Sequence, residues 1–439
     1  MHIGRLQGKQ PLGAGMLNVR KVILGLLAAG ALVLALQPIY FAAMVNLDRV
    51  ISHERTWRHI EDAFTSGVLE PGYHSQNFFI NGGDRFTDCY ALGVGLEPDV
   101  SAAIAGINAS RPVSDRHSCD DLKEASVNPS AVTWQRYSRY WHGYRLYSAP
   151  LASLLPIVAL KLLNLVLLAT VTVLFCVQVA ELIGAFATLS LCVPILFLSD
   201  FVRIWQVTPH TVSTAVILGG TALFAAAIRK GSSDLVLIVL AAAFGSIFNF
   251  VNFLVNPPWM PMLLAFLLVA TGRPARIALC CVAVWFSAYA TTWGAKWFAA
   301  YLVDPNFDIK SDVVGTALFR IAGDNAKVWH FPLAATVKVF GNMMLSWGIV
   351  IFLPALIFFR VPLRSRFALA WPALIPIAWF ELLSNHSQIH SGFVSRSAAA
   401  AVGVLIAAAR LSATADHRVA RASAQENGAL SPAENSARA

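Results

Sequence analysis

The sequence predicts an all-α protein that crosses a membrane many times, and three observations lead to this fold class. Of the 439 residues, 57% are hydrophobic and only 13% are charged, whereas soluble domains carry about 25% charged residues. The apolar residues form blocks, and a helix that crosses the hydrocarbon core needs about 20 of them in a row. The basic residues gather in short segments between these blocks. We therefore expect a polytopic helical membrane protein.

The apolar blocks predict about ten spans by the usual window criterion. The predicted spans are residues 22–45, 162–180, 182–198, 212–228, 235–251, 257–271, 277–300, 333–359, 367–383 and a last block that ends near Leu411. Residues 150–160 are apolar but short, which predicts a re-entrant or interfacial helix before the second span. The first block is longer than the hydrophobic region of a signal peptide and lacks a cleavage site, so we expect it to remain as a span.

Orientation follows from the basic residues, because Lys and Arg in short loops mark the cytoplasmic side. One topology places every basic cluster on that side, at residues 20–21, 229–230, 273–276, 360–366 and 410–421. The net charge of +9 is therefore a topology signal, and nucleic acid is not an expected partner.

The same topology predicts the organisation of the chain. It gives a cytoplasmic N-terminus (1–21), a first transmembrane helix (22–45), an extracytoplasmic loop or subdomain (46–149), a multi-helix transmembrane domain (150–411) and a disordered cytoplasmic tail (412–439).

The first extracytoplasmic loop is the most unusual part of this topology. A connection of about 100 residues between two spans is uncommon and is usually functional or a small domain. Apolar residues recur at helical spacing over 47–64, which predicts an amphipathic helix at its start. Cys89 and Cys119 both lie in this loop, outside the spans, so an oxidising compartment would permit them to pair. The sequence leaves open whether they do.

Two carboxylates of this loop, Asp84 and Asp88, lie just after the pair Gly82-Gly83. A turn followed by two aspartates is a candidate for acid–base chemistry. The alternative is a surface turn with solvated aspartates, which is common for this composition.

A second cluster lies where the chain re-enters the membrane, over residues 136–145. It contains Arg136, Arg139, Tyr140, Trp141 and His142. Tyr, Trp and Arg at this depth are typical of an aromatic belt. The number of basic side chains nevertheless exceeds what anchoring requires.

A third cluster, between two predicted spans, contains His386, His390 and Arg396. The two histidines share one face of a helical turn, and such a pair can bind a metal ion. Because no carboxylate or cysteine lies nearby in the sequence, a hydrogen-bonding patch that faces an anion is favoured, with Arg396 as its fixed charge.

A fourth cluster surrounds a break in the apolar sequence at Pro257-Pro258, directly before Trp259. Irregular backbone at membrane depth is tolerated where it lines a cavity. Asp200 and His210 lie at the same predicted level, and ionisable residues at this depth are functional candidates.

These clusters resemble parts of known proteins. One span, a long outer loop with an acidic pair and many further spans resemble the GT-C superfamily of membrane glycosyltransferases, which use polyprenyl-phosphate sugars. Short strings also resemble bacterial multi-span proteins that are associated with surface-polysaccharide loci: Thr87-Asp88, the residues 139–144, the aromatic and Asn segment that ends in Pro257, and Asn385-His386-Ser387 with His390 and Arg396.

The resemblance implies an enzyme in the bacterial cytoplasmic (inner) membrane with its active face outside. Its partners would be a polyprenyl-phosphate-linked sugar donor, a glycan or lipid acceptor and membrane lipids. An acidic residue of the first outer loop would be the general base. Asp88 ranks first and Asp84 second, while Asp48 and Glu54 stay open because the superfamily motif often lies nearer the first span.

The resemblance also assigns expected substrate contacts. Arg396, Arg139 or Arg136 would bind the leaving phosphate. Hydrogen bonds to phosphate or sugar would come from His386, His390 and His142, with Asp200 and His210 close by. Tyr140, Trp141 and Trp259 would stack on the sugar or the prenyl chain. No cofactor is implied, and a divalent metal stays open.

A further expectation is that one cavity holds Arg396, His386 and His390 together with Arg139 and His142. The reason is energetic, because an arginine beside the membrane core needs an anionic partner.

Other classes remain as alternatives. A transporter or flippase of lipid-linked glycans is the main rival, although transporters commonly contain internal repeats with matched broken helices. A polysaccharide polymerase, an acyltransferase and a structural membrane subunit are further alternatives. The sequence has no phosphate-binding Gly-rich loop followed by Lys-Ser or Lys-Thr, so a cytosolic nucleotide sugar is not an expected donor.

Overall fold

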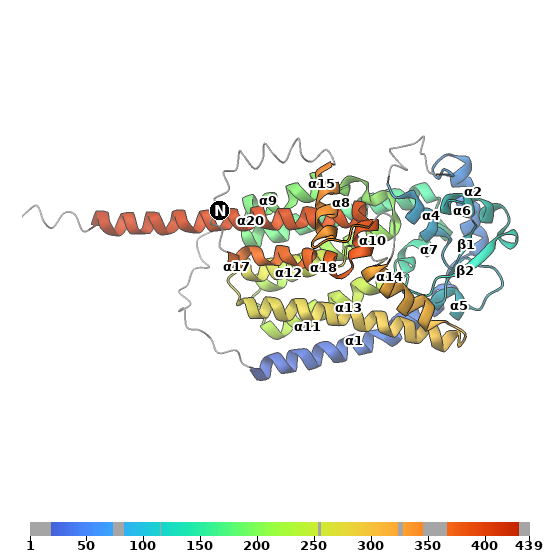
Figure 1. The fold of residues 1–439 in the computed structure, drawn as a ribbon, viewed down its shortest axis with the longest axis horizontal. Helices are drawn as coiled ribbons and strands as arrows, with labels where there is room; N and C mark the ends of the chain where they lie inside the picture. The colour runs from blue at the N-terminus through green and yellow to red at the C-terminus, as the bar shows by residue number, and fades with distance from the viewer. Residues whose placement is uncertain are drawn as a thin grey trace, which may run out of the picture.

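The computed structural model describes residues 19–72, 83–114, 116–252, 256–323, 328–345 and 367–429. These residues form a bundle of mostly parallel and antiparallel helices, with a small subdomain at one end (Figure 1). At the opposite end, the last helix extends beyond the bundle (Figure 1). The helix-rich fold agrees with the predicted class.

Six helices in the described part of the chain are long and apolar enough to cross a membrane. They are α1 (Val19–Leu47), α8 (Ile157–Ile183), α10 (Thr208–Arg229), α11 (Asp234–Val251), α13 (Ala275–Val303) and α20 (Ser391–Ala429). Three shorter apolar segments lie beside them: α9 (Ala185–Phe197), α12 (Trp259–Ala270) and the run of α17 (Phe367–Ala370), η4 (Trp371–Ala373) and α18 (Leu374–Leu382). The chain is therefore a helical membrane protein with several spans.

Most of the ten predicted blocks correspond to one of these helices. The block 333–359 corresponds only in part, to α15 (Ala334–Leu345), because its remainder lies outside the described residues. A single glycine, Gly184 with φ +90°, separates α8 from α9. Few L-residues adopt that backbone conformation, so the glycine permits the reversal between the two helices.

Two predicted boundaries are wrong. Helix α8 begins at Ile157, directly after Pro156, so residues 150–160 are divided between α7 (Arg145–Leu154) and the first turn of α8. The predicted span began at residue 162 because Lys161 is charged, but Lys161 lies inside α8.

The second wrong boundary is that of the tail. Residues 412–429 are not disordered but continue α20 to Ala429, while residues 430–439 lie outside the described part. This segment is rich in alanine, which has the highest helix propensity.

Close helix crossings hold the bundle together. A Cβ atom at Gly245 of α11 would collide with the backbone of Trp285 in α13, and one at Gly403 of α20 would collide with the backbone of Leu191 in α9. Small residues at such crossings allow helices to approach closely, which is the main source of packing energy between membrane helices.

The loop subdomain, as we call residues 48–154, contains the described part of the predicted extracytoplasmic loop. Its elements are α2 (His53–Thr65), α4 (Arg85–Gly93), α5 (Ala102–Ile107), β1 (Ser110–Val113), α6 (Ser118–Val127), η1 (Pro129–Ala131), β2 (Thr133–Arg136) and α7. The two strands pair antiparallel, with Ser110 opposite Arg136. Helix α2 is the expected amphipathic helix, and it buries Trp57 and Ile60 in a core separate from that of the bundle.

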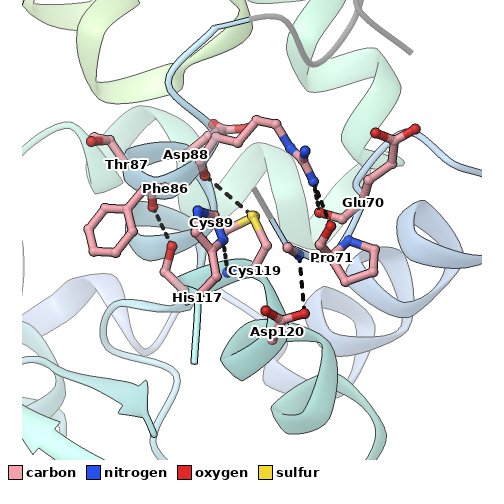
Figure 2. Close-up of a disulfide and its surroundings, with 12 residues drawn as sticks. Glu70, Pro71, Phe86, Thr87, Asp88, Cys89, His117, Cys119 and Asp120 are labelled. Carbon is pink, nitrogen blue, oxygen red and sulfur yellow. Dashed lines mark hydrogen bonds between the residues drawn. A yellow bond between two sulfur atoms is a disulfide. The ribbon is translucent and has the colours of Figure 1, made fainter. Parts of the chain in front are cut away.

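A disulfide between Cys89 and Cys119 joins α4 to α6, so the two loop cysteines do pair. Their Cα atoms are 5.0 Å apart, and both side chains are buried. Figure 2 shows this disulfide and its surroundings. The guanidinium of Arg85, four residues before Cys89, donates hydrogen bonds to the backbone oxygens of Glu70 and Pro71. The disulfide and the hydrogen bonds of Arg85 therefore both hold α4 in place.

Two short segments complete the subdomain end of the bundle. The first consists of a π-helical turn, η3 (Ile309–Gly315), followed by α14 (Thr316–Ala322). The second is α19 (Ser384–Ile389), which precedes α20 and packs against α14. The predicted connection 385–396 is thus helical for most of its length, and Arg396 lies within α20.

Candidate functional site

The candidate site lies where α4 of the loop subdomain meets the first residues of α8 and α10. Asp88 of α4 and Lys161 of α8 form an ion pair here, with 3.1 Å between Oδ2 and Nζ. Both side chains are almost fully buried. The backbone N–H of Thr208, the first residue of α10, donates a 3.4 Å hydrogen bond to Asp88 Oδ1. Both carboxylate oxygens of Asp88 therefore have protein partners.

Asp84 has a different environment at the N-terminus of the same helix. Its Oδ1 accepts a hydrogen bond from the backbone N–H of Thr87 at 3.2 Å, so Asp84 caps α4. Its Oδ2 is buried, and among the described residues it has no hydrogen-bond partner. Burial raises the pKa of Asp84 above its ordinary 3.8, against the opposing effect of the hydrogen bonds from Thr87.

His210 faces the open oxygen of Asp84, with 3.8 Å between Nε2 and Oδ2. On the other side of its ring, Nδ1 lies 3.2 Å from Nη1 of Arg396. A guanidinium can only donate hydrogen bonds, so Nδ1 must accept, and a neutral His210 carries its proton on Nε2. The N–H of His210 therefore points towards Asp84.

Arg396 is in turn held by Asp200 through two hydrogen bonds. Nε and Nη2 donate to Oδ1 and Oδ2 at 2.6 Å each. Desolvation would raise the pKa of Asp200, but the charge and hydrogen bonds of Arg396 outweigh it and hold this pKa below its ordinary value. The four side chains form one row, which we call the acid–histidine row: Asp84, His210, Arg396 and Asp200.

The glycine before Asp84 packs closely against the short helix η2 (Phe201–Gln206). A Cβ atom at Gly83 would lie 2.8 Å from Oε1 of Gln206, the last residue of η2, so a larger residue here would require the Gln206 side chain to shift.

A line of rings runs from the acid–histidine row to the third sequence cluster. The ring of Phe393 lies 5.7 Å from that of His210 and 5.8 Å from that of His390. The rings of His386 and His390 are 4.7 Å apart, so the two histidines do share one face. Among the described residues, no group of three or more His, Cys, Asp and Glu side chains has an arrangement that could hold a metal ion.

The residues of the second sequence cluster, 136–145, contact different parts of the structure. Arg139 binds Asp312 of η3, with Nε donating to Oδ1 at 3.0 Å. Tyr140 accepts a hydrogen bond from Arg320 of α14. Arg136 lies on β2 at the surface of the loop subdomain, where it binds Glu97 and Ser110.

His142 and Trp141 are packed into the structure. His142 has a φ of +57° and no exposed surface, and its Nε2 donates to the backbone oxygen of Tyr137 at 2.9 Å. Burial lowers its pKa to about 3, so it is neutral at physiological pH. Trp141 donates through Nε1 to the backbone oxygen of Thr292 in α13 at 2.8 Å. Trp259 is likewise fully buried, in the core of the bundle.

The expected common cavity of Arg396 and Arg139 stays a prediction. The two guanidinium groups bind different carboxylates, and the ring line ends at His386 and His390. The described pocket at the subdomain surface is lined by none of the predicted site residues; its lining includes Ser114, Arg116 and Glu124.

The alternative acidic residues lie elsewhere on the loop subdomain. Asp48 accepts a hydrogen bond from His53 at 2.6 Å and remains partly exposed. Glu54 binds Arg58 at 2.8 Å and is 83% exposed.

Two buried basic residues escaped the sequence analysis: Lys161, which belongs to the site, and Arg320, which lies beside Tyr140 and apart from it. Lys161 interrupts an apolar block, and a single charged residue within such a block was the available signal. Arg320 lies among Leu318, Phe319 and Ile321, and a lone arginine in an apolar loop gives the same signal.

Searches against family models, curated proteins and solved structures found no match for this chain.

Proposed function

We propose that this protein is a GT-C-type membrane glycosyltransferase. It moves a sugar from a polyprenyl-phosphate carrier to a cell-envelope glycan or lipid acceptor. The reaction takes place at the outer face of the bacterial cytoplasmic membrane, at the end of the bundle that carries the loop subdomain. The topology of about ten spans and the GT-C-like fold belong to this proposal.

The observation that carries the proposal is the state of Asp84. Its Oδ2 is buried, lacks a hydrogen-bond partner in the described part of the chain and faces the Nε2–H group of His210. A general base needs an oxygen that no other hydrogen-bond donor occupies, in a desolvated site, and its pKa should lie nearer the working pH than that of a free aspartate. Asp84 meets these conditions.

Asp88 meets them less well, although the sequence ranks it first. Lys161 and the N–H of Thr208 occupy its two oxygens. An oxygen that already accepts a hydrogen bond from an ammonium or an amide group is not free to take the proton of a substrate hydroxyl. We therefore place Asp84 as the base and Asp88 as the residue that positions it.

The proposed step runs as follows. The acceptor hydroxyl oxygen attacks the anomeric carbon of the donor sugar and forms the new glycosidic bond. Asp84 Oδ2 takes the hydroxyl proton, while the bond between the anomeric carbon and the phosphate oxygen breaks and the lipid phosphate leaves with the electron pair. His210, oriented by Arg396, turns its Nε2–H towards Asp84 Oδ2 at 3.8 Å, which is longer than a hydrogen bond and leaves that oxygen free to take the proton.

A transfer assay tests the proposal. The purified chain, in liposomes that contain a polyprenyl-phosphate with a radiolabelled sugar and a glycan or lipid acceptor, should transfer the label to that acceptor. Asp84→Asn keeps the shape of the side chain but removes its basicity, so turnover should fall by about a hundredfold or more. The matched control is Asp99→Asn, because Asp99 is exposed and its φ of +57° also suits asparagine.

Near-normal transfer by Asp84→Asn would contradict the role of Asp84. Movement of the labelled lipid across the bilayer without any sugar transfer would instead support the rival class, a flippase.

A further inference from the structure

The ion pairs of the predicted phosphate-binding arginines suggest a different anion site. Each of these three arginines already has a carboxylate partner. The pairs are Arg136 with Glu97, Arg139 with Asp312, and Arg396 with Asp200. Their positive charges are therefore neutralised within the protein.

Arg320 of α14 differs from all three. In the described part of the chain its hydrogen bond goes to the phenol oxygen of Tyr140, and no carboxylate lies within ion-pair distance. The side chain is 9% exposed. A buried guanidinium without a counter-charge is costly, and Arg320 has none among the described residues, which makes it a candidate to bind an anion from outside the chain.

Two aromatic rings form the walls around this guanidinium. Its Cζ atom lies 5.4 Å from the ring centre of Tyr140 and 5.7 Å from that of Trp293 in α13. Such cation–π contacts stabilise the guanidinium less than a counter-ion would. They do hold the planar group in place, and arginine has five N–H donors, so donors remain for a second ligand.

The surface beside Arg320 is apolar. Its neighbours Leu318, Phe319 and Ile321 are 62%, 46% and 43% exposed. In a protein that spans a membrane, exposed large apolar residues beside a buried cation match a lipid, whose chains are apolar and whose headgroup carries the charge. Arginine also fits the planar, bidentate geometry of a phosphate oxyanion.

We infer that Arg320, with Tyr140 and Trp293 around it, binds the phosphate group of a lipid whose chains lie over the exposed residues of α14. This site is separate from the acid–histidine row, and its existence does not depend on glycosyl transfer.

A ligand titration of the full chain tests the site. The protein is purified in a maltoside detergent, which contains no phosphate, and is titrated with mixed micelles that contain phosphatidic acid. Binding is followed by the thermal unfolding midpoint and by tryptophan emission, because the bound phosphate would alter the contact between Arg320 and Trp293. The midpoint should rise with lipid concentration.

The variants and ligands separate the outcomes. Arg320→Met should weaken the apparent affinity by about tenfold or more, and Arg320→Lys, which keeps the charge but not the planar donors, should lie between Met and wild type. Arg58→Met, which removes an exposed charge on α2, should behave as wild type. Diacylglycerol, which has the chains without the phosphate, should give no change that depends on Arg320.

A parallel titration with inorganic phosphate identifies the source of the anion. Weaker binding than that of phosphatidic acid assigns the site to a lipid, and equal binding assigns it to free phosphate. Equal affinity of wild type and Arg320→Met for phosphatidic acid would overturn the inference. This holds even if wild type transfers sugar and Asp84→Asn does not. Conversely, loss of binding in Arg320→Met would support the site even if no sugar is transferred.

Discussion

Asp84 and Asp88 lie one helical turn apart at the start of α4, yet their surroundings are opposite. Both carboxylate oxygens of Asp88 have partners, Lys161 and the backbone N–H of Thr208. These contacts join α4 to α8 and α10. Asp84 has one oxygen bound by its own helix and the other directed at His210. The same residue type, one turn apart on one helix, is thus structural at one position and available for chemistry at the other.

The difference shows how the tertiary fold, not the motif, distributes these roles. Helix α8 brings a cation to Asp88, while η2 and α10 bring an amide and an imidazole to the neighbourhood of Asp84. Three perturbations test the different roles of Asp84 and Asp88. They are given in order of their expected effect on stability.

The largest effect on stability should follow from removal of the buried cation. Lys161→Met leaves the carboxylate of Asp88 buried without its ammonium partner, and breaking a buried ion pair costs about 3–5 kcal/mol of unfolding free energy. Thermal or denaturant unfolding in detergent measures this loss. Asp84→Asn should show no comparable loss, because Oδ2 of Asp84 has no ion pair as short as that of Asp88.

The double variant Asp88→Asn with Lys161→Met provides the control. It removes both charges, so it should be less destabilised than the sum of the two single variants. Strict additivity would show that the two groups do not interact and would remove the contrast between the two aspartates.

The disulfide should have the second-largest effect. Cys89 and Cys119 are 30 positions apart, and loss of such a bond in a small domain costs about 2–4 kcal/mol. Replacement of both by serine should lower the unfolding midpoint and also reduce transfer, because α4 carries both aspartates. Cys280→Ser changes a free, half-buried cysteine and should leave both quantities near wild type. Full transfer by the double serine variant would show that α4 is held without the bond.

The smallest effect concerns pH. Because burial raises the folded-state pKa of Asp84, its protonated form stabilises the fold. This contribution is complete below the ordinary pKa of 3.8 and is lost as the pH rises through the folded-state pKa. Each unit of the shift corresponds to about 1.4 kcal/mol.

Asp84→Asn resembles the protonated form, so it should be more stable than wild type at neutral pH, and this advantage should vanish at pH values below 3.8. Unfolding midpoints across the pH range measure the difference. In the transfer assay, wild-type turnover should fall as the pH is lowered through the same folded-state pKa. A pH-independent stability difference would contradict the desolvated state of Asp84.

Much of the fold could be predicted from hydropathy alone, because the membrane requires long apolar helices. The errors arose where one residue ran against the pattern. Lys161 shortened a block that continues as helix, since its charge is neutralised by a residue far away in the sequence. The tail after position 412 looked polar and unstructured, but its alanine content favours helix.

The site could be predicted as a set of residues but not as a set of contacts. Asp84, Asp200, His210 and Arg396 were all candidates because they are ionisable and lie near one membrane face. Their order in the row could not be deduced, because Asp200 and Arg396 are 196 positions apart and one sequence carries no information on such pairs. Arg320 remained hidden because its lack of a carboxylate partner among the described residues becomes visible only in three dimensions.

The pair of Asp200 and Arg396 also sets an order of events during synthesis. The chain is made from its N-terminus, so Asp200 and His210 reach the membrane while Arg396 has not yet been translated. Until α20 is inserted as the last helix, Asp200 lacks the guanidinium that fixes it, and His210 lacks the donor that fixes its tautomer. The acid–histidine row is therefore completed only when the whole bundle has been assembled, and a chain that stops before α20 cannot contain a finished site.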